Sequence, residues 1–541
     1  MSSPASSLSA TSLTFAWPDG TPVLDGLDIS FGPGRTGLVG ANGSGKSTLL
    51  KLLSGALVPT GGTVRVSGEV GLLPQNVTLD TALRVDDALG IAAKRAALHA
   101  IEAGDAAEEH FETLDEDWDV EERALVTLGE LGLGHIGLDR TVGEVSGGES
   151  VLLRLAALLL RRPDVLLLDE PTNNLDLYAR RRLHAAVASW PGVLVVVSHD
   201  RELLDLVDQI ADLRAGEVAW YGGNYSAYEE ALAVEQEAAE RTVRAAEADV
   251  RKQRRELTDA HMKLARRKRY GQKMSDSKRE PKIVMGARKR AAQESAGKHR
   301  IMHEERLAEA RERLDEAVEA VRDDDEIRVD LPYTAVPPGR QVLTLEKLKT
   351  VHGPGVPGLL DLRGPERIAL VGRNGAGKTT LLRTIAGELP PVAGLAEAHV
   401  PLRFLPQRLD VLDDGATVAE NVARFAPGAT PNRVRARLAR FLFRGKRADQ
   451  LAGTLSGGER FRAALAALLL AEPAPQLLLL DEPTNNLDMA SVRQLTSALE
   501  SYEGALIVAG HDLPFLDSIG ITRWLLVADG ELRDAAREEI G

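Results

Sequence analysis

The sequence contains no cysteine, which excludes disulfide bonds, thiolate metal sites and cysteine nucleophiles. No apolar run approaches the roughly 18 residues that a membrane-spanning helix needs. The first residues, MSSPASSLSATS, lack the basic and apolar regions of a signal peptide. These absences predict a cytoplasmic protein that does not insert into a membrane.

Length and charge indicate several domains of different character. A chain of 541 residues has room for about three domains of roughly 100–200 residues each. The net charge of −14 argues against nucleic-acid binding by the chain as a whole. Residues 251–300, however, hold 18 Lys and Arg against 5 Asp and Glu. This asymmetry predicts one basic element that meets an acidic partner.

The chain is an internal repeat. GANGSGKSTLL begins at Gly40 and GRNGAGKTTLL at Gly372, and each is followed in the same order by LPQ, SGGE, LLLDEPTNNLD and HD. The offset between matched residues is 332 up to LPQ and 310 at SGGE. The first copy therefore carries about 20 extra residues within 76–145. They form either a surface loop or a small docking subdomain.

The region between the copies has a different pattern. Apolar residues recur every seven positions, which predicts two helices packed as a coiled-coil hairpin. The positions are Val243, Val250, Leu257, Leu264, Leu307, Leu314 and Val321. The breakers Gly271, Pro281, Gly286 and Gly297 predict an irregular tip. The first helix, at about 39 residues, is expected to reach roughly 60 Å.

Each copy begins with the phosphate-loop pattern G-x-x-x-x-G-K-[ST], between an apolar strand pattern and a helix pattern. A Gly-rich turn without function does not explain this context in both copies. Backbone N–H groups at the helix start favour anions, and the lysines are expected to hold the β and γ phosphates. The predicted ATP-binding residues are Gly40, Asn42, Gly43, Gly45, Lys46, Ser47, Thr48, Gly372, Asn374, Gly375, Gly377, Lys378, Thr379 and Thr380.

An acidic pair ends a fully apolar strand pattern in each copy. The first acid is expected to hold Mg²⁺, and the second to orient the attacking water. The strand patterns VLVVVSHD and ALIVAGHD place a histidine where it can contact the γ phosphate. The predicted metal ligands are Ser47, Gln75, Asp169, Thr379, Gln407 and Asp481, and the predicted catalytic residues are Glu170, Glu482, His199, His511, Gln75 and Gln407.

Together these motifs resemble the ATP-binding cassette superfamily over residues 8–230 and 340–535. The resemblance implies α/β cassettes in a head-to-tail sandwich within a monomer, in which each copy caps the nucleotide of the other. The first loop would be capped by Ser456, Gly457 and Gly458, and the second by Ser146, Gly147 and Gly148. It also implies that Trp17 stacks on adenine, whereas the second copy offers only His352.

The chain as a whole resembles the ABC-F family. The features that carry this resemblance are the two cassettes, the lack of a membrane segment, EPTNNLD in both copies, and YGGNYSAY at 221–228 before a basic linker. This implies cassettes at 1–230 and 326–541 joined by a helical hairpin at 231–325. It also implies ATP and Mg²⁺ as cofactors, and binding to the exit-tRNA site of the ribosome. Members of the family regulate translation or confer antibiotic resistance, and both roles stay open.

The linker cations predict contact with rRNA and tRNA backbones. The residues are Arg266, Arg267, Lys268, Arg269, Lys273, Lys278, Arg279, Lys282, Arg288, Lys289 and Arg290. A solvated coiled coil is the alternative for the linker, although such coiled coils tend to mix charges of both signs. For the whole chain, the alternative is a cytosolic ATPase pair that energises a transporter.

Overall fold

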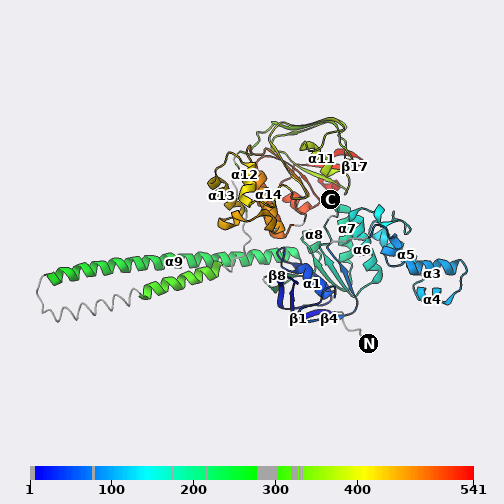
Figure 1. Ribbon diagram of the computed structural model, residues 1–541, viewed down its shortest axis with the longest axis horizontal. Helices are drawn as coiled ribbons and strands as arrows, with labels where there is room; N and C mark the ends of the chain where they lie inside the picture. Colours follow the sequence, from blue (N-terminus) through cyan, green and yellow to red (C-terminus); the bar gives the residue numbers. More distant parts are fainter. Residues whose placement is uncertain are drawn as a thin grey trace. The chain divides into compact units, whose positions relative to one another are not determined.

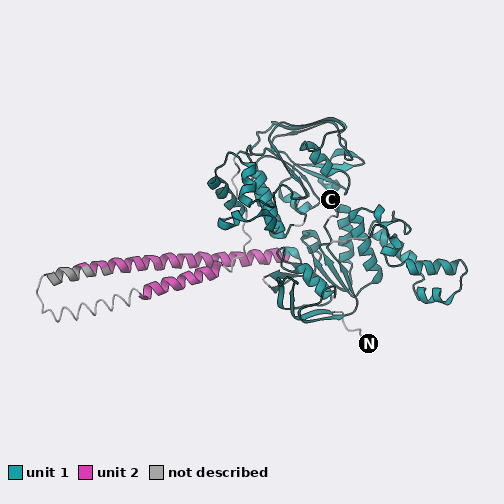
Figure 2. Cartoon of the chain, viewed as in Figure 1, with its two compact units in different colours: residues 1–226, 326–541 teal, residues 227–325 magenta. Residues whose placement is uncertain are grey.

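The computed structural model describes residues 7–75, 80–173, 175–214, 216–276, 301–318, 327, 331, 333–485 and 487–540. The chain divides into two compact units, shown in different colours in Figure 2. One unit contains residues 1–226 and 326–541, and the other residues 227–325. Both repeats therefore belong to one unit, and the linker forms a unit of its own.

The first repeat contains a six-stranded sheet of order β5-β6-β7-β3-β8-β9 and a three-stranded antiparallel sheet of order β2-β1-β4 (Figure 1). In the larger sheet, the strands from β5 to β8 pair in parallel, and β9 is antiparallel to β8. The strands are β1 Ser7–Ala16, β2 Pro22–Phe31, β3 Gly34–Val39, β4 Gly61–Ser67, β5 Val70–Leu73, β6 Val165–Asp169, β7 Val193–Val197, β8 Gln209–Arg214 and β9 Glu217–Gly222.

The second repeat has the same topology, with sheets of order β14-β15-β16-β12-β17-β18 and β11-β10-β13. The strands are β10 Gln341–Lys349, β11 Leu359–Arg363, β12 Arg367–Gly372, β13 Ala393–Ala398, β14 Leu402–Leu405, β15 Leu477–Asp481, β16 Ala505–Ala509, β17 Arg523–Ala528 and β18 Glu531–Ala535. The predicted α/β fold with two tandem P-loop domains is confirmed.

The central strands of the two large sheets are continuous apolar segments of the sequence. Every residue of β6 (VLLLD), β7 (VLVVV), β15 (LLLLD) and β16 (ALIVA) is buried. Parallel strands that are covered on both faces need such continuous apolar runs. The polar residues that follow each run must therefore lie at the edge of the sheet.

Helices surround these sheets. In the first repeat they are α1 Lys46–Leu53, α2 Val85–Ala88, α3 Ala92–Glu102, α4 Glu108–Leu114, α5 Val120–Glu130, α6 Gly147–Arg161, α7 Leu177–Ala188 and α8 Arg201–Leu204. In the second they are α11 Lys378–Ile385, α12 Val418–Phe425, α13 Pro431–Leu438, α14 Gly457–Leu469, α15 Met489–Glu500, α16 Leu513–Ser518 and α17 Arg537–Ile540. Short 3-10 turns are η1 Val142–Glu144, η2 Ala439–Phe441, η3 Gly445–Asp449 and η4 Ala452–Thr454.

In the region that holds the extra residues of the first copy, the structure describes the helices α2 to α5, joined by turns. Helices α3 and α4 lie side by side beyond α5 (Figure 1). Arg95 bonds to Asp86, Glu121 and Asp139, at 2.9, 3.1 and 2.7 Å. Part of the acidity of this segment is therefore neutralised internally.

The linker unit contains all but the first two residues of α9, Tyr225–Asp276, and a helical segment at 301–318. At 52 residues, α9 is about 78 Å long, so the expectation of about 39 residues was too short. Gly271 lies inside α9 rather than at the tip, because one glycine costs a helix only about 1 kcal/mol. Pro281, Gly286 and Gly297 lie outside the described residues.

Among the heptad positions that the structure describes, Leu307 is buried, and Val243, Val250, Leu257 and Leu314 are partly buried. Val321 lies outside the described residues, and the side chain of Leu264 is not described. Arg313 reaches across to Asp249 at 2.9 Å. The two segments therefore pack together as the sequence predicts. Among the described helices, none is long and apolar enough to cross a membrane.

Candidate functional site

Parallel strands bring the predicted residues of each copy to one sheet edge. In the first copy, Lys46 follows β3, Gln75 follows β5, Asp169 ends β6 and His199 follows β7. Asp169 of β6 pairs with Val197 of the parallel strand β7, so the carboxyl ends of these two strands lie at the same edge of the sheet. The second copy repeats this arrangement at the ends of β12, β14, β15 and β16. Ligands of open α/β sheets bind at such edges.

Each phosphate loop is shaped by glycine. Gly40 and Gly372 have φ angles of 147° and 154°. A Cβ atom would lie 2.4 Å from the carbonyl oxygen of Leu213 at Gly40, and 2.6 Å from that of Val527 at Gly372. Any side chain would therefore push the loop away from its sheet. The two loops require glycine at these positions to bring their backbone N–H groups toward a bound phosphate.

The loop lysines are buried and directed into their own loops. Lys46 Nζ donates to the carbonyl oxygens of Gly40 and Ala41 at 2.8 and 2.9 Å. Lys378 Nζ donates to that of Gly372 at 2.9 Å. Burial lowers the pKa of both lysines. A polyphosphate would stabilise their charged form, because an opposite charge nearby counteracts the cost of desolvation.

The first acid of each pair fits a divalent cation. Asp169 and Asp481 are 1% exposed, and burial raises the pKa of both. Ser47 Oγ donates to Asp169 Oδ1 at 2.9 Å. Both carboxylate oxygens of Asp481 lack a hydrogen-bond partner among the described residues. A buried carboxylate without a donor suits a metal ion or its bound water.

The described residues contain no group of three or more His, Asp or Glu side chains that would form a complete protein cage for a metal. Mg²⁺ is commonly held by one or two carboxylates together with substrate phosphates and waters. The donor set of one hydroxyl and one carboxylate in each copy therefore fits Mg²⁺ that arrives with a nucleotide.

The second acid of each pair faces the histidine of its own copy. His199 Nε2 lies 3.2 Å from Glu170 Oε1, and His511 Nε2 lies 3.2 Å from Glu482 Oε1. Burial raises the pKa of Glu170 to about 8 and that of Glu482 to about 7. Each glutamate can therefore take up a proton near neutral pH, as a general base must.

Burial lowers the pKa of His199 to about 4 and that of His511 to about 2. Both imidazoles are therefore neutral at pH 7. Lys378 Nζ lies 2.9 Å from His511 Nε2, and this nitrogen of a neutral imidazole can accept a hydrogen bond from the lysine. In their neutral form, these histidines can orient a water or donate to a phosphate without adding charge.

Both glutamates that the sequence predicts to be catalytic have an unusual backbone conformation. The φ angles of Glu170 and Glu482 are 48° and 47°, in the left-handed region. Their backbone N–H groups donate to the carbonyl oxygens of Val197 and Ala509, each at 2.8 Å. A non-glycine residue in this region costs roughly 1–2 kcal/mol. The same strain in both copies fixes the direction in which each carboxylate leaves its strand.

Two aspartates that the sequence interpretation missed connect the copies. The backbone N–H of Asn42 donates to Asp488 Oδ2 at 3.1 Å, and that of Asn374 donates to Asp176 Oδ2 at 3.2 Å. Each aspartate also caps the helix that follows it, α15 or α7. The signal was present, since both close the repeated TNNLD sequence. Each loop thus contacts the opposite copy.

One cross-contact breaks the symmetry. Arg180 Nη1 donates to the carbonyl oxygen of His511 at 3.5 Å, so a cation of the first copy lies at the second site. After Lys378, Arg180 is the next group that lowers the pKa of Glu482. The matched residue in the second copy is Val492. The neighbouring Tyr178 ring lies 5.7 Å from the Arg373 guanidinium, within cation–π range.

The SGGE segments begin helices α6 and α14. Ser146 and Ser456 are N-caps, and each forms a reciprocal capping box with Glu149 or Glu459. The S-x-x-E spacing is the sequence signature of this cap, and the sequence interpretation did not use it. In the described part of the chain, the opposite phosphate loop bonds to Asp176 or Asp488 rather than to these serines. Capping of the nucleotide in trans by Ser146 and Ser456 therefore stays a prediction.

The adenine position differs between the copies. Trp17 is 40% exposed and packs edge-to-face on Phe15, with ring centroids 5.1 Å apart. The contact with Phe15 therefore supports Trp17, and part of its side chain stays exposed to solvent. The corresponding region of the second copy presents His352, which has a positive φ of 56°.

The structure describes the side chains of only two of the predicted RNA-binding residues. Arg266 and Arg269 are exposed on α9. Arg267, Lys268 and Lys273 belong to α9, but their side chains are not described. The remaining residues Lys278, Arg279, Lys282, Arg288, Lys289 and Arg290 lie outside the described residues.

Comparison with known families identifies both repeats. The family model described as ABC transporter matches residues 24–173 and 359–485. These ranges contain the phosphate loop and the acidic pair of each copy. They mark the two sites as ATP-binding sites of the cassette type.

Three relatives align over most of their own length and most of this chain. Tylosin resistance ATP-binding protein TlrC of Streptomyces fradiae is 34% identical, over 94% of this chain and 95% of its own. Energy-dependent translational throttle protein EttA of Mycobacterium tuberculosis is 34% identical, over 92% and 87%. Probable ATP-binding protein YheS of Escherichia coli (strain K12) is 32% identical, over 95% and 78%.

Two solved structures share the fold. The chain matches an RNase-L Inhibitor with a TM-score of 0.58 and 21% identity, over 94% of this chain and 87% of the other. It matches an archaeal ribosome recycling factor, aABCE1, with a TM-score of 0.58 and 21% identity, over 97% and 89%. With its tandem cassettes and these full-length relatives, the chain belongs to the ABC-F family of ATP-binding cassette proteins.

Proposed function

We propose that the protein hydrolyses ATP with Mg²⁺ at two composite sites and couples the ATP state to binding of the ribosome. The observation that supports the two sites is the pair of crossed bonds from Asp176 and Asp488 to the opposite phosphate loops. Each site then contains the loop of one copy and an aspartate of the other. A site of this kind is complete only when the copies close on each other.

Hydrolysis at each site requires charge neutralisation and a positioned water. Lys46 or Lys378 would hold the β and γ phosphates, and Ser47 with Asp169, or Thr379 with Asp481, would hold Mg²⁺. When bound, Mg²⁺ neutralises charge on the phosphates. Glu170 or Glu482 accepts the proton of the attacking water, and the neutral histidine beside it orients that water or the γ phosphate.

The ribosome is proposed as the partner on the chemistry of the linker and on the names of two relatives. EttA is named as a translational throttle, and TlrC as a tylosin resistance protein. Exposed cations lie along the long helix α9, and Arg266 and Arg269 continue them toward its end. A row of Lys and Arg suits RNA, which is recognised largely through shape and phosphate backbone.

Sedimentation with 70S ribosomes tests the proposed function. The Glu170→Gln/Glu482→Gln variant is expected to bind ATP without hydrolysing it and to keep the copies closed. We expect it to enter the ribosome pellet with ATP and to stay in the supernatant without ATP. The Lys46→Ala/Lys378→Ala variant is the control, because it loses the phosphate contacts and should not enter the pellet in either condition.

Absence of the glutamine variant from the pellet with and without ATP would contradict the ribosomal role. Recovery of the same variant with membranes would then favour the alternative, an ATPase pair that serves a transporter. ATP binding measured in the same sample separates both outcomes from a variant that fails to bind nucleotide.

A second prediction concerns the asymmetry of the sites. In a Glu170→Gln background, turnover should come from the second site, where Arg180 lowers the pKa of Glu482. The substitution Arg180→Gln removes that cation, so Glu482 holds its proton more strongly. We expect turnover at pH 7 to fall by up to roughly tenfold, the equivalent of about one pKa unit, and to recover at pH 9.

The matched control places Arg180→Gln in a Glu482→Gln background, where turnover comes from the first site. The pH profile should then change little, because burial is the largest cause of the raised pKa of Glu170, and the cation that lowers this pKa is Lys46 rather than Arg180. Arg180 also pairs with buried Asp200 at 3.4 Å, so thermal unfolding must show that both variants remain folded. Equal pH shifts in the two backgrounds would refute a role confined to the second site.

A further inference from the structure

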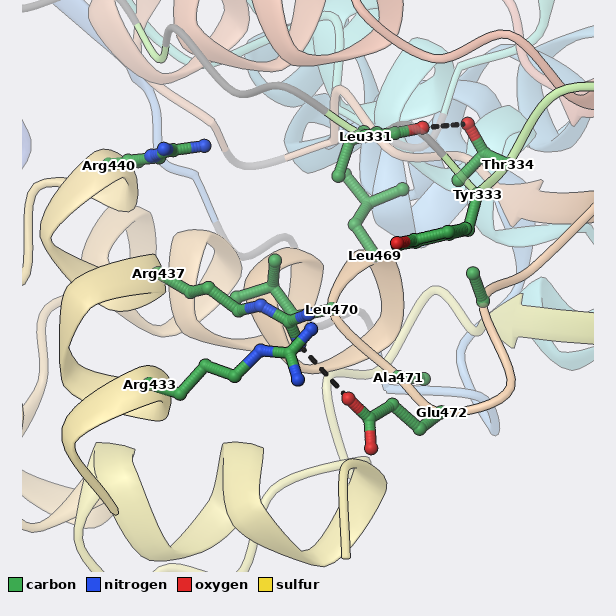
Figure 3. A pocket seen from close by; sticks show the side chains of 11 residues that line it. Leu331, Tyr333, Thr334, Arg433, Arg437, Arg440, Leu469, Leu470, Ala471 and Glu472 are labelled. Atoms are coloured by element: carbon green, nitrogen blue, oxygen red, sulfur yellow. Dashed lines mark hydrogen bonds and ion pairs between the residues drawn. The ribbon is translucent and has the colours of Figure 1, made fainter. Parts of the chain in front are cut away.

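A cavity of about 240 Å³ lies in the second copy, remote in sequence from the phosphate loops. Three arginines line one wall, Arg433 and Arg437 on α13 and Arg440 on η2. Figure 3 shows the side chains of Arg433 and Arg437 extending from α13 toward Glu472. We call this cavity the arginine pocket.

The arginine pocket has an excess of positive charge. Arg437 lies 3.4 Å from Glu472, the one acid among the described residues that line the cavity. Arg433 and Arg440 have no hydrogen bond or ion pair among the residues that the structure describes. In contrast, Arg435 on the same helix bonds to Asp449 at 3.0 Å. Two guanidinium groups directed into one cavity without partners favour an anionic ligand.

The other walls are aromatic and apolar. Tyr333 is 71% exposed and lines the arginine pocket opposite α13 (Figure 3). Leu469 and Leu470, at the end of α14, are buried beneath the opening. An exposed tyrosine beside cations matches the combination that binds nucleic-acid strands, in which bases stack and phosphates pair.

Size and spacing favour a strand over a free nucleotide. At about 240 Å³ the cavity is smaller than the roughly 300–1,000 Å³ of pockets that enclose small molecules. Arg433 and Arg440 are seven residues apart, a rise of about 10 Å along a helix. That span exceeds one phosphate group and suits successive phosphates of one strand.

We infer that the arginine pocket binds a single-stranded or looped segment of RNA, with phosphates on Arg433, Arg437 and Arg440 and a base on Tyr333. The inference rests on the proposed function, because the ribosome would supply the RNA. It assigns to the second cassette a contact separate from the linker.

Photo-crosslinking to an oligoribonucleotide that contains 4-thiouridine tests the inference on the full chain. Crosslinked peptides are mapped, and we expect one crosslink at Tyr333 and others on α9. The Arg433→Gln/Arg440→Gln variant should lose about fivefold or more of the Tyr333 crosslink and keep those on α9. The control Arg363→Gln/Arg383→Gln removes the same charge from exposed positions of the second cassette and should change neither.

The salt dependence of crosslinking at Tyr333 provides a second readout. Each phosphate contact with a single strand contributes about 0.7 to the slope of log K against log salt. Loss of two arginines should therefore lower that slope by about 1.4. Tyr333→Phe and Tyr333→Trp should both retain the crosslink at this position, because both keep an aromatic ring. Tyr333→Ser removes the ring, so its binding is measured by the protection that the oligonucleotide gives to a nearby peptide. We expect that protection to weaken by about fivefold, which corresponds to ~1 kcal/mol of stacking.

The outcomes separate the two proposals. Crosslinks on α9 without any at Tyr333, or equal loss in the arginine variant and its control, would overturn the pocket assignment and leave the ribosomal role intact. Crosslinks at Tyr333 without ATP-dependent ribosome sedimentation would support the pocket and contradict the proposed function. Displacement of the Tyr333 crosslink by millimolar inorganic phosphate as readily as by unlabelled oligonucleotide would identify a free-phosphate site and overturn the RNA assignment.

Discussion

ATP turnover by the Glu170→Gln/Glu482→Gln variant is expected to fall about 10²–10⁴-fold, the usual contribution of a positioned general base. Glutamine keeps the size of the side chain but cannot accept the proton of the attacking water. Phosphate release measured at saturating ATP checks the loss. Binding of a fluorescent ATP analogue should change little, because the phosphate contacts of Lys46 and Lys378 remain.

The single variants provide the control for this prediction. If the two sites work independently, each single variant should retain the activity of its unaltered site. If hydrolysis must alternate between the sites, each single variant should lose most of the activity. A double variant that keeps more than about a tenth of the parental rate would refute the role of these carboxylates as bases. Loss of ATP binding in the same variant would instead indicate that the carboxylates hold the loop in place.

The same substitutions are expected to stabilise the nucleotide-free protein at alkaline pH. The pKa of Glu170 is raised to about 8 and that of Glu482 to about 7, against an ordinary value of 4.5. Between pH 4.5 and 8, the folded protein keeps protons that the unfolded chain releases. The free energy of unfolding of the parent therefore falls as the pH rises through this window.

Glutamine does not ionise, so the double variant escapes this loss. At 1.36 kcal/mol for each pKa unit, its advantage over the parent should reach several kcal/mol at pH 8.5 and approach zero near pH 4.5. Urea unfolding at the two pH values measures the difference. The surface variant Glu217→Gln, whose side chain is exposed, is the control and should behave as the parent at both. A constant difference across the range would mean that burial does not govern these two carboxylates.

Much of the fold and of the candidate site could be predicted because the relevant physics is local. An apolar run such as VLLLD or ALIVA forms a buried parallel strand, and the polar residues after it must lie at the sheet edge. Glycine at Gly40 and Gly372 follows from backbone geometry that no other residue adopts easily. Repetition of each motif in one order removed the ambiguity of any single motif.

The linker shows where local patterns fail. The heptads predict two packed helices and the glycine predicts a break at Gly271, but α9 continues to Asp276. A helix that packs along another can retain one glycine, since tertiary contacts outweigh a propensity difference of about 1 kcal/mol. The end of a helix is therefore set by the whole packing environment rather than by one residue.

By itself, the sequence determined the two cassettes, the residues at the ends of their strands and the basic linker. Only the tertiary structure decided which groups meet across the copies. The bond from Arg180 to His511 joins residues 331 positions apart, and the arginine pocket joins Tyr333 to Arg433 and Arg440. Neither carries a local signal, because periodicity and motif spacing report contacts along one element, whereas such pairs depend on how distant elements pack.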